Sequence, residues 1–488
     1  MIGQLLKSFV TVALTLLIAV IGWGAYHYFS FEQRDDETRL KGKRDYLEHI
    51  ETLGANLNDA PDIIFILYDD MGYGDIGAGA TRPGPIATPH LDALAENGMV
   101  LSDFHSPAPT CTPSRAGYLT GRLPPRAGLP HVIFPSDSRK AFFLHTMTGS
   151  DSNIRLPAEE ITLAEVLQAA GYHTGMVGKW HLGDHSPSLP NDFGFDYYYG
   201  ALYSNDMAPF ELYRNRKIDV PAPVDQRYLS ERYIDAALGF LEQAGAQRFF
   251  LYFAHNFPHD PLSARNERLG SSDGGLYGDV LEEIDEGIGA LIAALRQSGR
   301  LDNTLIIVSS DNGPWYQGNA GGQRGRKGNT FEGGMRVPFI AHWPAAIDGG
   351  EHSTAMAMGT DLLPTVLEIL ALPAPNDRVL DGRSMLPVLQ QGTAAPDRYL
   401  HYYDGETLFA VRDQRFKYRA AAGVHYATDQ MPVAFAVSQK EWLFDLQADP
   451  GESYDVSARY PEKLEKLRQE FQRKQAEMAA NKRGWVSR

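Results

Sequence analysis

Residues 63–70 read IIFILYDD, and this stretch decides the fold. Six consecutive apolar or aromatic residues bounded by polar ones are typical of a strand that is buried on both faces of a sheet. Residues 305–309 (LIIVS) and 249–253 (FFLYF) show the same pattern. Helical patterns lie between and around these runs, at residues 162–170 and 278–297. Strands that alternate with helices predict an α/β fold with a mainly parallel sheet flanked by helices.

The pattern changes after about Pro373. Shorter strand-like pieces follow at residues 399–403 and 408–412, and a charged amphipathic helix is expected from residue 461 to about 480. We therefore predict a body over residues 61–375 and a smaller C-terminal antiparallel α+β domain over residues 376–488, which ends in a helix.

The N-terminus begins with an apolar segment. Residues 9–28 carry no formal charge, and twenty helical residues span about 30 Å, the thickness of a bilayer core. We expect residues 1–30 to be a signal anchor, with a cleaved signal peptide and a buried core helix as alternatives. The polar residues 31–60 would form a stalk or a short helix. Five basic residues after the span oppose an exported body under the positive-inside rule: Arg34, Arg39, Lys41, Lys43 and Arg44.

Composition excludes several classes of protein. Subtracting 61 acidic residues from 45 Lys and Arg gives a net charge of −16, so the chain lacks the basic surface of a general nucleic-acid binder. The many aromatic residues exclude a disordered chain. A single cysteine cannot form an intramolecular disulfide.

Oxygen-bearing side chains follow two of the predicted strands. Asp69 and Asp70 come directly after the first, and Asp311 and Asn312 follow Ser310 at the end of another. Ligands in open α/β sheets bind beyond the carboxyl ends of strands, so these residues could share one crevice. Crowded carboxylates need a cation, and oxygen ligands suit Ca²⁺ or Mg²⁺. The alternative is two independent turns, because Asp-Asp and Asp-Asn-Gly are common turn sequences.

The only cysteine occurs in an unusual setting. A solitary cysteine is usually a small buried hydrophobic residue, but Cys111 lies among prolines and polar residues, with Arg115 four positions later. The sequence C-x-P-S-R-x-x-x-x-T-G from Cys111 to Gly121 resembles the sulfatase signature. In the sulfatase family a separate enzyme reads C-x-P-x-R and converts the cysteine to formylglycine, whose hydrated aldehyde is the nucleophile.

Further segments resemble the same family in the same order, over about residues 61–420. Residues 171–183 (GYHTGMVGKWHLG) resemble the second sulfatase signature, which includes Lys179 and His181. Residues 325–334 resemble the loop that presents a substrate-facing lysine, which matches Lys327. The family's catalytic histidine precedes a proline by two positions, so His259 matches it better than His255. Ser204 resembles a serine that contacts substrate, in a more variable segment.

The resemblance implies an alkaline-phosphatase-like fold with a smaller C-terminal antiparallel sheet and helix. It also implies that the chain hydrolyses sulfate monoesters through formylglycine at position 111 and a divalent metal, Ca²⁺ or alternatively Mg²⁺. The implied metal ligands are Asp69, Asp70, Asp311, Asn312 and formylglycine itself. Arg115 and Lys179 would hold the nucleophile, Asp311 would help to deprotonate it, and His181 would take a proton during sulfate release. Lys179, Ser204, His259 and Lys327 would bind substrate, and His259 would protonate the leaving oxygen, with Lys327 as a second candidate.

Two alternatives remain open. One is a phosphonate monoester or phosphodiester hydrolase of the same superfamily, and the other is a catalytically dead protein that binds sulfated glycans. The expected partners are a sulfate ester such as a sulfated glycan, the formylglycine-generating enzyme and, through the N-terminal helix, a membrane, but no nucleic acid. We expect the body outside the cytoplasm. Residues 132–155, 204–227 and 401–403 are candidates for recognising the alcohol part of the substrate.

Overall fold

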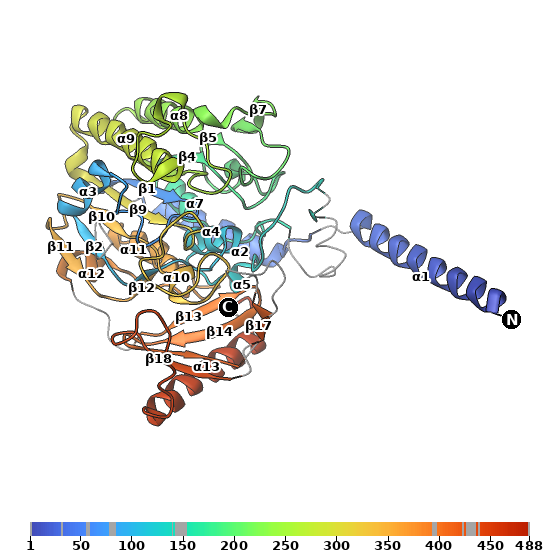
Figure 1. Cartoon of the computed structure of the whole chain (residues 1–488). Helices are drawn as coiled ribbons and strands as arrows, with labels where there is room; N and C mark the ends of the chain where they lie inside the picture. Colours follow the sequence, from blue (N-terminus) through green and yellow to red (C-terminus); the bar gives the residue numbers. More distant parts are fainter. Residues whose placement is uncertain are drawn as a thin grey trace.

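The structure is a computed structural model that describes residues 2–30, 33–54, 59–77, 84–138, 140–141, 154–392, 398–421, 424–425, 436–437 and 440–486. Most of the predicted loop at 132–155 therefore lies outside the described residues. The described elements form a large sheet with helices on both faces and a second, smaller sheet beside it (Figure 1).

The large sheet has ten strands, and its centre is parallel. The strand order is β11 (Glu351–Ser353), β2 (Met99–Leu101), β10 (Ile340–His342), β9 (Thr304–Ser310), β1 (Asp62–Tyr68), β8 (Phe249–Ala254), β4 (His173–Gly178), β5 (Tyr197–Gly200), β6 (Leu212–Arg214) and β7 (Lys217–Val220). Strands β9, β1, β8, β4 and β5 are parallel neighbours, whereas β10, β6 and β7 pair antiparallel toward the sides of the sheet. The three long apolar runs of the sequence are β1, β8 and β9, so the prediction of a mainly parallel sheet flanked by helices is confirmed.

Two apolar cores cover the two faces of this sheet. In β1, Ile63, Phe65 and Leu67 belong to one core, and the alternating residues Ile64 and Ile66 belong to the other. The first core is completed by α2 (Glu37–Leu53), α4 (Cys111–Thr120), α5 (Pro124–Ala127), α7 (Leu163–Ala169), α11 (Leu362–Ile369) and α12 (Leu386–Gln391). The second is completed by α3 (Pro89–Glu96), α8 (Leu229–Ala244) and α9 (Gly275–Gln297). Because strand side chains alternate, the unbroken apolar run from Ile63 to Tyr68 of β1 serves both cores.

The smaller C-terminal sheet is antiparallel, as the sequence predicts. Its order is β13 (Leu400–Asp404), β14 (Thr407–Arg412), β15 (Phe416–Arg419) and β18 (Trp442–Asp445), and α13 (Pro461–Ala480) packs against it. Two short pairs also form, β3 (Phe104–His105) with β12 (Ala357–Met358), and β16 (Val424–His425) with β17 (Ala436–Val437). The apolar core of this sheet includes Leu123, Met335 and Met356 of the body, so the two parts are packed together.

The segment expected as a stalk contains α2, which packs on the body. Tyr46 and Ile50 are buried in the first core, and Lys43 forms an ion pair with Glu165 of α7. Ahead of α2, Asp35 forms an ion pair with Arg155. The structure thus places residues from about 33 onward in the body rather than in a free linker, because apolar and charged side chains of α2 have partners there.

The first helix, α1 (Ile2–Ser30), stands apart from the body (Figure 1). Its side chains between Lys7 and Trp23 are exposed. Among the residues that the structure describes, no helix combines the length and the apolar character that a membrane span needs.

Candidate active site

Four neighbouring parallel strands end at the same edge of the large sheet. Tyr68 of β1 is in register with Ser310 of β9, so Asp69 and Asp70 emerge beside Asp311 and Asn312. β4 and β8 end in register at Gly178 and Ala254, and they lead into Lys179 and the segment that contains His259. Residues far apart in the sequence therefore meet beyond the carboxyl ends of the strands, where open α/β sheets bind ligands.

Backbone geometry at this edge is demanding. The Lys179 amide donates to the Ala254 carbonyl at 2.7 Å, and a Cβ on Gly178 would lie 1.9 Å from that same oxygen. Gly178 also has a φ of +111°, so only glycine fits between the two strands here. Asp70 and His181 adopt positive φ values of 68° and 63° without being glycine, a form of backbone strain that is concentrated at functional sites.

Cys111 is the first residue of α4 and is only 3% exposed. Its Sγ lies 3.4 Å from Asp69 Oδ1. Arg115, one turn later, reaches Asp311 Oδ2 through Nε at 2.9 Å and the Lys179 carbonyl through Nη1 at 2.6 Å. Cys111 lies at the positive end of the α4 dipole, but burial and the charge of Asp69 raise the pKa of its thiol, so the thiol is protonated.

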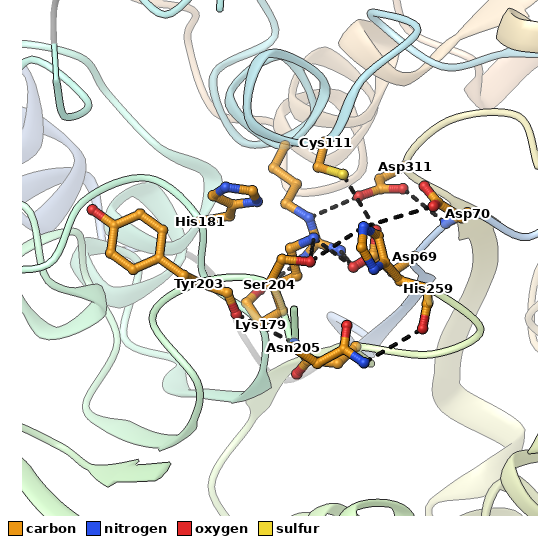
Figure 2. Close-up of polar contacts among 12 residues, drawn as sticks. Asp69, Asp70, Cys111, Lys179, His181, Tyr203, Ser204, Asn205, His259 and Asp311 are labelled. Atoms are coloured by element: carbon orange, nitrogen blue, oxygen red, sulfur yellow. Dashed lines mark hydrogen bonds and ion pairs between the residues drawn. The ribbon is translucent and has the colours of Figure 1, made fainter. Parts of the chain in front are cut away.

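Carboxylates and cations alternate around Cys111 (Figure 2). Lys179 Nζ donates to Asp69. Lys327 Nζ donates to Asp70 at 2.8 Å. Asn312 Nδ2 donates to Asp70 Oδ1 at 2.7 Å. All of these groups except Lys327 are almost fully buried, so their interactions are little screened by water.

Asp69 and Asp311 differ in acidity because their surroundings differ. Burial, together with the charge of Asp69, raises the pKa of Asp311 to about 7. Burial also opposes ionisation of Asp69, but Lys179, His259 and Arg115 overcome it and hold the pKa of Asp69 well below its usual range. One carboxylate is thus firmly ionised, and a neighbour can exchange a proton near neutrality.

The donor set fits a hard divalent cation. Ligand atoms of Asp69, Asp70, Cys111 and Asp311 lie within 4.8 Å of one another. Asn312 Oδ1 is buried and accepts no hydrogen bond from the part of the chain that the structure describes. The charges of Asp69, Asp70 and Asp311 are balanced by Arg115, Lys179 and Lys327, so a divalent cation would make the site positive and suited to an anion.

Ser204 and His259 lie on the outer side of the cluster. Ser204 Oγ is 3.3 Å from Lys179 Nζ and 3.3 Å from His259 Nε2. His259 Nε2 is also 3.8 Å from Asp70 Oδ2, and burial together with Lys327 lowers its pKa. His255 instead accepts from the Phe257 amide through Nδ1 and stacks edge-on against Tyr233. Of the two histidines, the structure brings His259 to the cluster.

His181 lies to the left of the cluster in Figure 2, beside Tyr203. Its Nε2 is 3.0 Å from the Ile133 carbonyl, which makes this nitrogen the donor and leaves Nδ1 as an unprotonated acceptor. Nδ1 has no partner among the described residues. Burial, followed by the charges of Lys179 and Arg115, holds the pKa of His181 well below its usual range, so the ring is neutral and able to accept a proton.

Asn205 is a site residue that the sequence analysis missed. Its Nδ2 donates to the carbonyls of His259 at 3.4 Å and Pro261 at 3.0 Å, and thereby ties the His259 loop to the Ser204 segment (Figure 2). The only signal in the sequence was its position next to Ser204.

A pocket of about 270 Å³ borders the His181 and Ser204 segments. It is lined by aromatic residues and carboxylates, among them Tyr203, Phe210, Tyr213, Asp137, Asp184 and Glu211. This pocket belongs in part to the predicted recognition segment at residues 204–227.

The fold and the site define a hydrolase of anionic esters with an alkaline-phosphatase-like architecture. Residues 61–372 match the Sulfatase family model, and residues 326–481 match the model of the C-terminal region of N-sulphoglucosamine sulphohydrolase. The chain belongs to the sulfatase family, and it is a sulfuric ester hydrolase.

Individual relatives agree over most of the chain. N-acetylgalactosamine-6-sulfatase of Rattus norvegicus is 33% identical over 471 residues, with 88% of each chain covered. Arylsulfatase A of Homo sapiens is 35% identical over 458 residues, covering 84% of this chain and 86% of the relative. The crystal structure of PsFucS1 sulfatase from Pseudoalteromonas sp. superimposes with a TM-score of 0.72 at 26% identity, over 91% of this chain and 95% of that one.

Proposed function

We propose that Cys111 is converted to formylglycine and that this side chain attacks the sulfur of a bound sulfate monoester. The observation that carries the proposal is the convergence of Cys111 Sγ with Asp69, Asp311 and three cationic side chains. The hydrated aldehyde supplies one hydroxyl as the nucleophile and a second hydroxyl that allows sulfate to be released. A serine at this position lacks that second group.

Asp69, Asp70, Asp311, Asn312 and the modified residue 111 would hold a divalent cation, Ca²⁺ or alternatively Mg²⁺. Three carboxylates and the free amide oxygen of Asn312 match the oxygen ligands that these ions prefer. When bound, the ion supplies charge neutralisation and Lewis acidity at the sulfate oxygens.

The residues of the chain would divide the remaining work. Asp311 accepts a proton from the nucleophile, while Arg115 and Lys179 hold its oxygens in place. Lys179, Lys327 and Ser204 bind the sulfate oxygens. His259, with Lys327 as the second candidate, protonates the leaving oxygen, and neutral His181 accepts the proton of the second hydroxyl when sulfate departs.

For the alcohol we propose a carbohydrate. The pocket beside Ser204 combines tyrosine and phenylalanine faces with carboxylates, and such side chains can bind the faces and hydroxyls of a sugar ring. The name of the N-acetylgalactosamine-6-sulfatase relative is consistent with a sulfated sugar.

We further propose that the body acts outside the cytoplasm, with residues 1–30 as the targeting segment. Fractionation of cells that make the full chain, followed by N-terminal sequencing, tests both parts. A mature protein that begins after residue 30 would favour a cleaved signal peptide, and recovery of the body in the cytoplasm would contradict the proposal.

Mass spectrometry of the Cys111 peptide, combined with turnover assays, tests the mechanism. We expect loss of the thiol in favour of the aldehyde or its hydrate, and faster turnover of aryl sulfates and sulfated sugars than of aryl phosphonates and phosphodiesters. A preference for phosphodiesters by orders of magnitude would identify a phosphohydrolase of the same superfamily. An intact thiol in the protein from its native host, with no turnover, would identify a binding protein.

A further inference from the structure

A second buried cluster of charged side chains joins the body to the C-terminal sheet. It lies outside the cluster around Cys111, and its centre is Glu332, which is 1% exposed. The other members come from β3 and its approach, from the C-terminal sheet, and from the loop after β18: Asp103, His105, Tyr402, Arg412, Lys417 and Glu452.

Glu332 is held from both sides. Its Oε2 receives Arg412 Nη1 at 2.8 Å and lies 2.9 Å from His105 Nε2, and its Oε1 receives Lys417 Nζ at 3.0 Å and the Tyr402 hydroxyl at 3.1 Å. These contacts hold the pKa of Glu332 well below its usual range, because the cations, Lys417 first, overcome the cost of burial. Since Arg412 and Lys417 already occupy the carboxylates, this cluster is an ionic clamp and not a cation site.

The clamp continues along the chain toward Lys327. Arg419 of β15 donates through Nη1 to Thr330 Oγ1 at 2.8 Å, and its guanidinium lies over the Phe331 ring at 4.1 Å. The Glu332 amide donates to Glu452 Oε2 at 2.6 Å. Thus three successive residues, 330 to 332, are fixed by side chains of the C-terminal region.

The other end of the segment contacts the loops of the active site. The Gly328 amide donates to the Pro109 carbonyl at 2.8 Å, two residues before Cys111, and the Lys327 amide donates to the Pro314 carbonyl at 3.1 Å, two residues after Asn312. Lys327 makes one of these two contacts itself and lies three residues before the clamped segment, and its Nζ donates to Asp70. A shift of residues 330–332 would move the lysine relative to the nucleophile.

We propose that Thr330 and Glu332 are positioning residues, through which Arg419, Arg412 and Lys417 of the C-terminal sheet fix Lys327 in the active site. This inference rests on the proposed role of Lys327 at the sulfate. It assigns to the C-terminal sheet a part in the reaction, although that sheet supplies none of the side chains that surround Cys111 in the described structure.

A double-mutant cycle with Lys327 tests the proposal. Thr330→Val removes the acceptor of Arg419 and leaves the ionic clamp intact, and Glu332→Gln preserves shape but removes the central charge. In the otherwise native, matured enzyme we expect each to lower kcat/KM by between about tenfold and a hundredfold, as small displacements of catalytic groups do. In a Lys327→Ala background the same substitutions should change kcat/KM by less than about twofold, because the group that they position is gone.

Arg415→Met is the matched control. Arg415 precedes β15, pairs with Asp445 at 2.6 Å and is about half exposed, so its loss should leave kcat/KM unchanged in both backgrounds. Equal losses from Thr330→Val with and without Lys327, or no loss in either background, would overturn the inference. If Glu332→Gln fails to fold, Thr330→Val alone decides. A Lys327→Ala enzyme with full activity would instead overturn the proposed role of Lys327, and the inference with it.

Discussion

At the scale of single residues, charge compensation determines what each group around Cys111 can do. Asp69 and Asp311 are both fully buried, but Asp69 contacts the ammonium of Lys179, whereas Asp311 has Arg115 on one side and Asp69 nearby. The first carboxylate is therefore a fixed anion, and the second can accept a proton near pH 7. The two oxygen pairs were predictable from the sequence because they follow strand ends, but this difference in acidity depends on side chains brought in by other strands.

The sequence alone also does not determine which of two nearby histidines reaches the site. His255 and His259 are four residues apart, and only the path of the loop after β8 decides which one reaches Ser204 and Asp70. Family resemblance favoured His259, and its placement agrees. Asn205, which ties that loop in position, has no distinguishing pattern in the sequence.

Cys111→Ser tests the nucleophile. Because serine is close in size, we expect the thermal midpoint to change little, while turnover of an aryl sulfate should fall by more than about a thousandfold, as when other covalent nucleophiles are removed. Turnover and thermal unfolding should be measured on the same preparation. Retention of most of the activity would show that formylglycine is not required.

At the scale of elements, the long apolar strands and the helices α7, α9 and α13 were predictable, whereas the short strands and α2 were not. β1, β8 and β9 carry continuous apolar runs because both of their faces are covered. β2, β10 and β11 have three residues each, and their strand geometry comes from pairing with neighbours rather than from local preference. α2 was not distinguished from a stalk because about half of its residues are charged, and its buried face has only a few residues such as Tyr46 and Ile50.

Thr162→Ala tests the capping of α7. Thr162 Oγ1 accepts from the Glu165 amide at 3.2 Å, and the Thr162 amide donates to Glu165 Oε2 at 3.0 Å. We expect the free energy of unfolding to fall by about 1 kcal/mol or more, since the hydroxyl also donates to the Phe193 carbonyl. Urea unfolding measures this change. Thr162→Ser, which keeps the acceptor, should recover most of it, and equal losses for both variants would exclude the cap as the cause.

Asp404→Asn tests a carboxylate at the end of β13. Burial raises the pKa of Asp404 to about 6, against a weaker opposing effect of Arg419, so the folded state holds a proton that the unfolded chain releases near pH 4. Its contribution to stability is complete below about pH 4 and is lost as the pH rises through about 6. The variant should therefore gain stability relative to the native protein between pH 4 and pH 7.

Urea unfolding of both proteins across that range gives the difference directly. Asp273→Asn is a suitable control, because Asp273 is exposed and its carboxylate is in contact with water in the folded protein. A difference between native and Asp404→Asn proteins that does not vary with pH would contradict the prediction.

At the scale of the whole molecule, the site residues come from distant parts of the body and meet at the carboxyl-terminal edge of the large sheet. The C-terminal sheet packs against the body. The α/β body and the antiparallel sheet were both predictable, since each has its own pattern of apolar residues. The ionic clamp around Glu332 was not, because its members lie between residues 103 and 452 and each looks like an ordinary charged residue in sequence.

Chelation should destabilise the whole molecule. A cation that binds only the folded state adds about 2.7 kcal/mol at a hundred times its dissociation constant. We therefore expect a chelator to lower the thermal midpoint by several degrees, and excess Ca²⁺ to restore it. Asp311→Ala should bind less metal, measured by elemental analysis, and its midpoint should respond less. If the thermal midpoint of the native protein changes with neither chelator nor Ca²⁺, the proposal of a cation at this site is contradicted.

The burial of Cys111 also determines whether its modification comes before or after folding. Only 3% of the residue is exposed, and α4 is enclosed by the body. Another enzyme therefore cannot bind the cysteine and its neighbours once folding is complete. The proposed conversion has to happen while this segment is still extended, during synthesis or transport. Conversion must therefore precede folding. A molecule that folds with its thiol intact would be stable and correctly folded but permanently inactive. The active fraction of a preparation would therefore depend on the rate of modification relative to the rate of folding, and not on the stability of the enzyme.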